Sequence, residues 1–396
     1  MALRALARVN LAAIERNVAH LRGGLTGSTA LCAVVKADGY GHGAPQAARA
    51  ALAGGASWLA VASAQEAAEL RGAGITARVL VMGAISAQEL PIAVRAGAEV
   101  TAWSERFISE LADAAAAGFA TTLASVPASR RTPVAVHVKL DTGMGRLGTR
   151  DADRALRVAE LVCDAEPALA LRGAMTHFAT ADDDPEFLAH QLAAFNRFAA
   201  QIRRRHPDVL LHAANSAATM REPASHHDLV RCGIAIYGCD PMNEDAARHG
   251  LEPALALSSY VAAVKLARAG DSAGYGRRFV APRDTWIATL PIGYADGIRR
   301  ALSGNCDVLI GGRRHPLVGT VSMDNITVDL GPDPIACSGT SAIVIGRDGR
   351  EQQSAEDLAR RIGTINYEIV CGISGRVPRL YHRDGVTTEE PRPPDD

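Results

Sequence analysis

A single lysine ends a wholly apolar run near the N-terminus, and a lysine in that position could carry chemistry. The stretch is LCAVVKADGYGHG, residues 31–43, in which Lys36 is followed by small residues, a tyrosine and a histidine. Burial lowers the pKa of a lysine, because a low dielectric disfavours the ammonium form, and leaves an amine that can act as nucleophile or base. A structural lysine whose stem only reaches to the rim of a strand would have the same sequence. The stretch alone therefore leaves both interpretations open.

Polar residues also follow several later apolar runs of the chain. Lys139 ends one run and is followed by Arg146 in DTGMGRLG, His177 and Ser216 lie at or near the ends of two others, and the last run carries Arg231. The C-terminal ends of parallel barrel strands meet at one rim, which is where such barrels collect their catalytic groups. We therefore expect these side chains to share one mouth with Lys36.

The elements that would position these residues are eight short β-rich runs between residues 30 and 240. They alternate with alanine-rich segments of helical periodicity, and Ser63 with Glu66 fits a capping box at the start of one such helix. The runs are ALCAVV, SWLAVAS, ARVLVMG, EVTAW, PVAVHVKL, LRGAMTHF, DVLLHAAN and LVRCGIAIYG. This alternation predicts a TIM-like (β/α)8 barrel of the α/β class, with an open doubly wound sheet as the alternative.

After residue 243 the pattern changes to longer β-rich runs, such as TWIATLPIGYADG, that are separated by turns. This pattern predicts a second, mainly β domain. The last residues, DGVTTEEPRPPDD, are acidic and rich in proline, which is typical of disorder. We therefore predict a barrel domain over residues 1–243, a C-terminal β domain over 244–384 and a disordered tail over 385–396.

Composition excludes several classes of partner. The 42 Lys and Arg residues balance 43 Asp and Glu residues, so no positive field would attract nucleic acid or anionic lipid. No apolar run reaches the roughly 18 residues of a membrane span, and the N-terminal stretch lacks the apolar centre of a signal peptide. The seven scattered cysteines include no CxxC pair. We expect a reduced, cytoplasmic protein that acts on a small molecule, without a metal site and without nucleic acid or membrane as a partner.

Nine motifs carry a family resemblance. AVVKADGYGHG resembles the cofactor-lysine motif of the alanine racemase family, in which a barrel that binds pyridoxal 5'-phosphate (PLP) precedes a C-terminal β domain. The other eight follow in family order: KLDTGMGRLG, MTHFATAD, HAANSAA, RCGIAIYG, GYGRRF, PIGYADG, GTVSMDN and GTINYEIVCGISGRVPRLY. One such string would be weak support, since short glycine-rich strings recur by chance. The resemblance implies an isomerase that interconverts L- and D-alanine for bacterial peptidoglycan, as a homodimer with shared active sites.

The resemblance also implies two bases on opposite faces of the substrate Cα. Lys36 matches the lysine that binds PLP covalently and serves as one base. Tyr275 matches the tyrosine that serves as the other and reaches the site from the partner subunit. A phenol has an ordinary pKa of about 10 and needs positive charge nearby to favour the phenolate. Without the motif order, Tyr275 would be interpreted as a turn tyrosine between two glycines.

Arg231 matches the arginine that faces the PLP ring nitrogen. Since arginine stays protonated and offers no acceptor, it should leave that nitrogen unprotonated and suppress side reactions such as transamination. His177 resembles the histidine that orients this arginine. The remaining cofactor-binding residues that the resemblance implies are Tyr40, Ser216, Gly233, Ile234 and Tyr367, of which Ser216, Gly233 and Ile234 hold the phosphate.

Arg146 and the backbone of Met323 match the groups that hold the carboxylate of the amino-acid substrate. A guanidinium suits this role, because it can bind a carboxylate with two parallel hydrogen bonds. Lys139 occupies the position at which some members carry a carbamylated lysine, and an unmodified structural lysine is equally open. The residues that match the inner gate of the substrate channel are Asp182, Tyr294 and either Arg299 or Arg300.

Three alternatives share parts of this pattern. A PLP carrier protein would need neither the second domain nor Tyr275, and a barrel decarboxylase of basic amino acids would present an acidic residue in place of Arg231. A broad-specificity or serine-preferring amino-acid racemase stays open, because it would use the same two bases. The tandem pair Arg277 and Arg278 departs from the family pattern, and the effect of Cys371 near the pocket has no interpretation from sequence.

Overall fold

The computed structural model describes residues 3–121, 132–334 and 336–388, and the chain divides into two compact units. The barrel unit comprises Glu15–Gly39 and Ala44–Ile236. The sheet unit comprises Met1–Ile14, Tyr40–Gly43 and Tyr237–Asp396, and therefore combines both ends of the chain.

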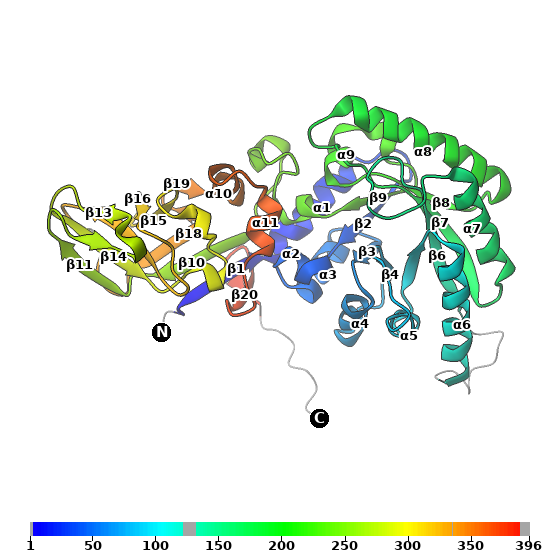
Figure 1. The fold of residues 1–396 in the computed structure, drawn as a ribbon, viewed down its shortest axis with the longest axis horizontal. Helices are drawn as coiled ribbons and strands as arrows, with labels where there is room; N and C mark the ends of the chain where they lie inside the picture. The colour runs from blue at the N-terminus through cyan, green and yellow to red at the C-terminus, as the bar shows by residue number, and fades with distance from the viewer. Residues whose placement is uncertain (1–2, 122–131, 335, 389–396) are drawn as a thin grey trace. The chain divides into compact units, whose positions relative to one another are not determined.

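The barrel unit contains eight parallel strands in the order β8-β7-β6-β5-β4-β3-β2-β9 (Figure 1). They are β2 (Ala30–Val34), β3 (Trp58–Val61), β4 (Arg78–Val81), β5 (Glu99–Ala102), β6 (Val134–Lys139), β7 (Leu169–Met175), β8 (Leu210–His212) and β9 (Leu229–Cys232). The ring closes where Asp228 N–H donates to Leu211 O at 3.0 Å and Arg231 N–H donates to Ala214 O at 2.9 Å. Each strand falls in or overlaps a predicted run, so the (β/α)8 barrel is confirmed and the doubly wound alternative is wrong.

Helices cover the outer face of this barrel (Figure 1). They are α1 (Leu11–Gly23), α3 (Ala44–Ala53), α4 (Ala64–Gly72), α5 (Leu90–Arg95), α6 (Glu105–Thr121), α7 (Ala152–Asp164), α8 (Pro185–Arg205) and α9 (Ser216–Arg221). The capping box predicted for α4 is present, since Ser63 Oγ accepts from Glu66 N–H at 3.2 Å and Glu66 Oε2 accepts from Ser63 N–H at 3.1 Å. This box starts α4 directly after β3 and so fixes where Glu66 stands at the rim.

The sheet unit is built around an 11-stranded sheet in the order β11-β14-β17-β16-β15-β18-β10-β1-β20-β21, with β19 paired to β18. Its strands are β1 (Ala5–Asn10), β10 (Leu255–Tyr260), β11 (Ala263–Ala267), β14 (Thr285–Leu290), β15 (Asp307–Ile310), β16 (Arg313–Val318), β17 (Ile326–Gly331), β18 (Ser341–Asp348), β19 (Glu351–Gln353), β20 (Arg379–Arg383) and β21 (Val386–Thr387). A two-stranded ribbon, β12 (Ser272–Ala273) with β13 (Phe279–Val280), and the helices α10 (Ala355–Arg361) and α11 (Asn366–Cys371) complete it. The predicted mainly β second domain is confirmed.

Strand β1 joins this sheet although it comes from the N-terminus. It pairs antiparallel with β10 and parallel with β20, and its alternate residues Ala5, Ala7 and Val9 are buried. The predicted boundaries at residues 243 and 384 stay predictions. The predicted tail over 385–396 lies outside the described residues from 389 onward, while its first part includes β21.

None of the helices in the described ranges combines the length and apolar character that a membrane span requires.

Candidate active site

Lys36 stands directly after β2, at the C-terminal rim of the barrel, where it is half-buried. The chain then turns through a left-handed segment, with φ of 51° at Ala37 and 52° at Asp38. Each non-glycine residue in this region costs about 1–2 kcal/mol, so neighbouring groups must hold the turn. Glu66 Oε1 accepts from Ala37 N–H at 2.7 Å, and Asp38 Oδ1 accepts from Ala44 N–H at 2.9 Å. These bonds fix the direction in which Lys36 leaves the strand.

Positive charges gather at this rim. Lys139, the last residue of β6, is only 3% exposed. Its burial, together with the positive charges of Arg231, Arg146 and Lys36, lowers the pKa of Lys139 to about 8, and Asp141 opposes this shift. Four of the predicted site residues therefore share one electrostatic neighbourhood at the barrel mouth.

Arg146 itself is exposed on the loop that follows β6. The loop folds around the buried carboxylate of Asp141, which accepts from Gly143 N–H at 3.1 Å and Gly145 N–H at 3.0 Å and pairs with Arg150 at 3.3 Å. Burial acts to raise the pKa of Asp141, but these N–H donors and Arg150 outweigh it and lower that pKa. The loop is held by an ionised side chain and presents Arg146 outward.

Arg231 lies 2% exposed within β9 and is surrounded by acceptors. Its Nη1 contacts His212 Nδ1 at 3.0 Å, and its Nη2 donates to Thr176 O at 2.8 Å and Ala213 O at 2.9 Å. Nη2 also lies 3.2 Å from His177 Nδ1, so the structure brings this predicted pair together. Burial, followed by the charge of Arg231, lowers the pKa of His177 well below its ordinary value, so the neutral imidazole accepts. Nε of Arg231 is buried and has no hydrogen-bond partner among the described residues.

The residues predicted to bind the phosphate are brought together around Ser216, the first residue of α9. Ser216 is buried, and its Oγ accepts from Gly233 N–H at 2.9 Å and Ala235 N–H at 3.4 Å. Because this oxygen already accepts twice, the Ser216 hydroxyl can use its own proton to donate to an anion. Ile234 directly follows Gly233 and begins a short 3₁₀ turn.

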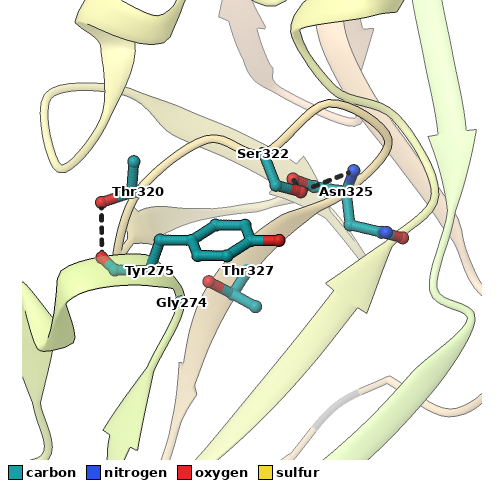
Figure 2. A pocket seen from close by; sticks show the side chains of 6 residues that line it. All are labelled: Gly274, Tyr275, Thr320, Ser322, Asn325 and Thr327. Carbon is teal, nitrogen blue, oxygen red and sulfur yellow. Dashed lines mark hydrogen bonds between the residues drawn. The ribbon is translucent and has the colours of Figure 1, made fainter.

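Tyr275 lines a hollow of about 360 Å³ in the sheet unit (Figure 2). Its backbone carbonyl accepts from Thr320 Oγ1 at 2.9 Å, which ties the turn to the loop before β17, whereas its side chain is 75% exposed. Gly274 has a φ of +77°, and a Cβ there would lie 3.0 Å from Thr320 N. The residues that line the hollow are Gly274, Tyr275, Thr320, Ser322, Asn325 and Thr327. The turn is therefore rigid at its backbone while the phenol is presented to the outside of this unit.

Tyr294 and Met323 are brought together on neighbouring turns of the same unit. Tyr294 N–H donates to Ser322 O at 2.9 Å, and Ala295 N–H donates to Met323 O at 3.1 Å. Both side chains are exposed. The predicted carboxylate-binding backbone and the predicted gate tyrosine are therefore one hydrogen-bonded assembly.

Tyr40 and Tyr367 also meet within the sheet unit, with ring centroids 6.1 Å apart. Tyr40 is buried and adopts a φ of +53°. Tyr367 follows the buried Asn366, whose Nδ2 donates to Asp240 O at 2.7 Å and Glu356 Oε1 at 2.8 Å. This buried cluster anchors the start of α11 and with it Tyr367.

Asp182 is the predicted residue with the least support from its surroundings. It is exposed, and its backbone carbonyl accepts from Arg221 Nη1 at 2.6 Å. Of the two arginines predicted for the gate, Arg299 donates from Nη2 to Glu368 O at 2.6 Å, next to Tyr367.

Comparison with known proteins identifies the family. Residues 9–241 match the family model "Alanine racemase, N-terminal domain", and residues 254–381 match "Alanine racemase, C-terminal domain". The chain belongs to the alanine racemase family. Among curated relatives, alanine racemase of Mycobacterium tuberculosis is 43% identical over 96% of this chain and 96% of that protein, and alanine racemase of Geobacillus kaustophilus is 40% identical over 95% and 94%.

Solved structures of alanine racemases have the same fold. The crystal structure from D-cycloserine-producing Streptomyces lavendulae superposes with a TM-score of 0.89 at 38% identity, covering 96% of this chain and 98% of that chain. The Bacillus anthracis structure with bound L-Ala-P gives 0.87 at 35% identity, covering 98% and 97%.

Two residues of this alanine racemase scaffold were missed in the sequence. His212 belongs to the HAANSAA motif, but only the structure shows that it contacts Arg231. The sequence indicates Glu66 only as part of a helix cap. In the structure its Oε1 also accepts from Ala37 N–H and so holds the turn after Lys36. A signal for His212 existed, because a histidine at the buried end of a strand must have a hydrogen-bond partner.

A buried ion pair clamps the Tyr294 and Met323 turns of this alanine racemase family member. Asp296 accepts from Arg4 at 2.8 and 2.9 Å and pairs with Arg376 at 3.0 Å, and both arginines also reach Asp324. Since Arg4 and Arg376 are half-exposed, they can be resolvated when the buried carboxylate is lost. We therefore expect loss of the Asp296 carboxylate to lower stability without preventing folding.

Replacing Asp296 with asparagine is expected to lower the free energy of unfolding by about 1–3 kcal/mol, because the buried charge partner of two arginines is removed. Denaturant titration measures this change. The matched control is Asp284→Asn, which removes an exposed carboxylate paired with Arg268 in the same unit and should leave the free energy nearly unchanged. An equal loss in both variants would show that the buried clamp adds no more stability than the exposed pair of Asp284 and Arg268.

Proposed function

We propose that this protein is a PLP-dependent alanine racemase that interconverts L- and D-alanine with Lys36 and Tyr275 as opposed bases. The observation that carries the proposal is the unpartnered Nε of Arg231, buried in the same charged neighbourhood as Lys36. Family membership supports the reaction, since the relatives compared above are named alanine racemase. The D-alanine product would supply peptidoglycan for a cell wall, and the cytoplasmic location expected from the sequence remains part of the proposal.

The polar groups of the rim fit PLP. A pyridine nitrogen is an acceptor, and the buried Nε of Arg231 is a donor that lacks one. Phosphate oxygens are acceptors, and the Ser216 hydroxyl has a proton to donate beside the backbone of Gly233 and Ile234. Lys36 supplies the amine that an aldehyde requires. We assign Tyr40, Tyr367 and His177 to the same cradle, His177 through its contact with Arg231.

The cofactor would withdraw electrons from the substrate Cα and so make its proton acidic. Lys36 would then hold or release a proton on one face of that carbon, and the Tyr275 hydroxyl would do the same on the opposite face. Burial lowers the pKa of Arg231 to about 10, so the guanidinium stays charged at neutral pH and does not yield a proton to the ring. Proton movement is thus confined to Cα, as racemisation requires.

We assign the substrate carboxylate to Arg146 and the backbone of Met323. A guanidinium fork binds a carboxylate with two parallel hydrogen bonds. The exposure of Arg146 and Met323 in their own units supports contact with a ligand. Tyr294 and Asp182 would act as the gate.

A homodimer with shared active sites is part of the proposal. The large exposed ring of Tyr275 supports it, because a phenol that must act as a base on a buried substrate needs a covering surface. In this arrangement the barrel domain, residues 1–243, binds PLP and the partner's β domain, residues 244–384, completes the site. If the active enzyme sediments as a monomer, the proposal of a homodimer with shared active sites is wrong.

The test is proton NMR of the PLP-loaded protein in heavy water with L-alanine, followed by chiral analysis. We expect loss of the Cα proton signal together with formation of D-alanine. Serine, lysine and arginine in parallel samples report substrate range. Absence of exchange with every amino acid would contradict the proposal, as would release of carbon dioxide from a basic one.

We also propose that Lys139 is carbamylated. Lys139 shares its neighbourhood with Lys36, Arg146 and Arg231, so its conversion from a cation to an anion would relieve repulsion. Its pKa of about 8 leaves a sizeable neutral fraction near neutral pH. That amine can attack carbon dioxide, forming an N–C bond and releasing one proton, to give a carbamate.

NMR with isotope-labelled bicarbonate should show one carbamate signal in the wild type. At constant carbon dioxide pressure the signal should grow as pH rises through about 8, because the neutral fraction of Lys139 grows there. Lys139→Ala should lose the signal, whereas Lys265→Ala, which changes an exposed lysine of β11, should keep it. A wild type without a signal would contradict the prediction.

A further inference from the structure

A chain of buried polar side chains crosses the barrel interior away from Arg231. His212 lies at the end of β8, and its Nε2 is 2.8 Å from Nδ1 of His137 on β6. Nε2 of His137 is 2.8 Å from Oε2 of Glu99, the first residue of β5. Oε1 of Glu99 accepts from Nε of Arg78, the first residue of β4, at 2.6 Å. Hydrogen bonds thus connect Arg231 at the mouth with a carboxylate at the opposite, N-terminal end of the strands.

Only one arrangement of protons satisfies this chain. Arg231 has only donors, so Nδ1 of His212 must accept and its proton must sit on Nε2. That proton is donated to Nδ1 of His137, whose own proton therefore sits on Nε2 and is donated to Glu99. Every bond is directed from the guanidinium toward the carboxylate, and reversing any one would set two donors or two acceptors against each other.

The charges agree with this direction. Burial first, and then the charge of Arg231, lowers the pKa of His212 well below its ordinary value, and burial lowers that of His137, so both rings are neutral. Burial acts to raise the pKa of Glu99, but the hydrogen bonds from His137 and Arg78 outweigh it and lower that pKa. Glu99 is thus an anion connected to the buried cation by two neutral imidazoles.

The barrel makes room for the chain at a cost in packing. Barrel interiors are normally filled by branched apolar side chains, which cost less to bury than a charged network. At residue 173 of β7 a Cβ would lie 2.2 Å from Nδ1 of His137, so Gly173 gives the ring its space. Arg78, which closes the chain, lies 3.8 Å over the ring of Trp58. Gly173 therefore leaves room for the His137 ring, and the stacking on Trp58 holds Arg78 where it donates to Glu99.

We propose that Glu99 is a positioning residue that acts on Arg231 through His137 and His212. Its carboxylate sets the tautomers of both histidines and supplies the counter-charge for the buried guanidinium. This holds the arginine with its unpartnered Nε available to an acceptor at the barrel mouth. The inference rests on the proposed function, which makes that acceptor the ring nitrogen of PLP.

Two substitutions in the PLP-loaded, full-length protein separate the parts of this role. Glu99→Gln keeps an acceptor for His137 and removes the charge, whereas Glu99→Met keeps the volume and removes both. The control is Glu160→Gln, which changes an exposed carboxylate on α7 that pairs with Arg205. Nitrogen NMR of isotope-labelled PLP reports the hydrogen bond at its ring nitrogen, and dialysis reports how tightly PLP is retained.

We expect the ring-nitrogen signal to shift in both Glu99 variants and PLP to be retained about 10- to 100-fold less tightly in Glu99→Met, by analogy with the loss of outer partners around metal ligands. Glu160→Gln should match the wild type in both measurements. A ring-nitrogen signal and PLP retention unchanged in both folded Glu99 variants would overturn the proposal. A merely structural role would lower stability without moving the nitrogen signal.

Should the variants fail to fold, nitrogen NMR of the labelled imidazoles in the wild type decides. Protons on Nε2 of both His212 and His137 support the directed chain, and a proton on Nδ1 of either ring overturns it. Neither measurement depends on turnover. A protein that binds PLP with this chain intact but does not exchange the Cα proton of alanine would contradict the proposed function alone.

Discussion

Replacing Lys36 with alanine is expected to give a folded protein that no longer retains PLP through dialysis and no longer exchanges the Cα proton of alanine. The substitution removes the only amine proposed to hold the cofactor covalently and, with it, one of the two bases. Loss of a general base alone costs about 100- to 10,000-fold in rate, and loss of the covalent link adds to it. Absorbance of the bound cofactor and NMR exchange in heavy water measure the two losses separately.

The small number of lysines in the chain makes it simple to test which one holds the cofactor. The sequence contains three lysines, of which Lys36 and Lys139 lie at the barrel mouth and Lys265 lies exposed on β11 of the sheet unit. Lys265→Ala is therefore the matched control and should retain cofactor and exchange. Borohydride reduction followed by peptide mapping identifies the modified residue in the wild type. A PLP adduct on Lys139 would show that the cofactor lysine was wrongly assigned.

The barrel could be predicted from sequence because each of its strands is an apolar run bounded by turn residues. The polar residues at their ends were predictable for the same reason, since a parallel barrel places all such ends at one rim. Arg231 and His177 are the clearest case, because Arg231 lies on one predicted strand, His177 lies at the end of another, and the structure joins them by a hydrogen bond.

Other features depend on contacts between distant residues and have no local signal. Ala37 and Asp38 adopt left-handed angles that are strained for residues with a side chain, and bonds with Glu66 on α4 and Ala44 on α3 support them here. Strand β1 lies near the N-terminus, yet it pairs with β10 and β20 from the far end of the chain. The sequence does not indicate that Glu99 is buried, because a charged residue at the start of a strand normally faces solvent.

Replacing Tyr275 with phenylalanine should separate proton exchange from inversion. The change removes one hydroxyl from a side chain that is 75% exposed, so the fold and the retention of PLP should persist. Racemisation in both directions should fall by about 100- to 10,000-fold, because inversion needs a proton donor on each face of the substrate Cα. Lys36 remains, so one enantiomer of alanine should still exchange its Cα proton for deuterium without changing hand.

The measurement uses L-alanine and D-alanine in separate samples of heavy water, with Tyr260→Phe as the control because Tyr260 lies on β10 and is only half-exposed. Wild-type racemisation by the Tyr275 variant would show that the second base is another group. Loss of exchange with both enantiomers would be a different failure, since it would mean that Tyr275 is needed to bind substrate rather than to move one of its protons. Exchange of a single enantiomer is the result that only two opposed bases predict, because each hand of alanine then presents its proton to a different residue.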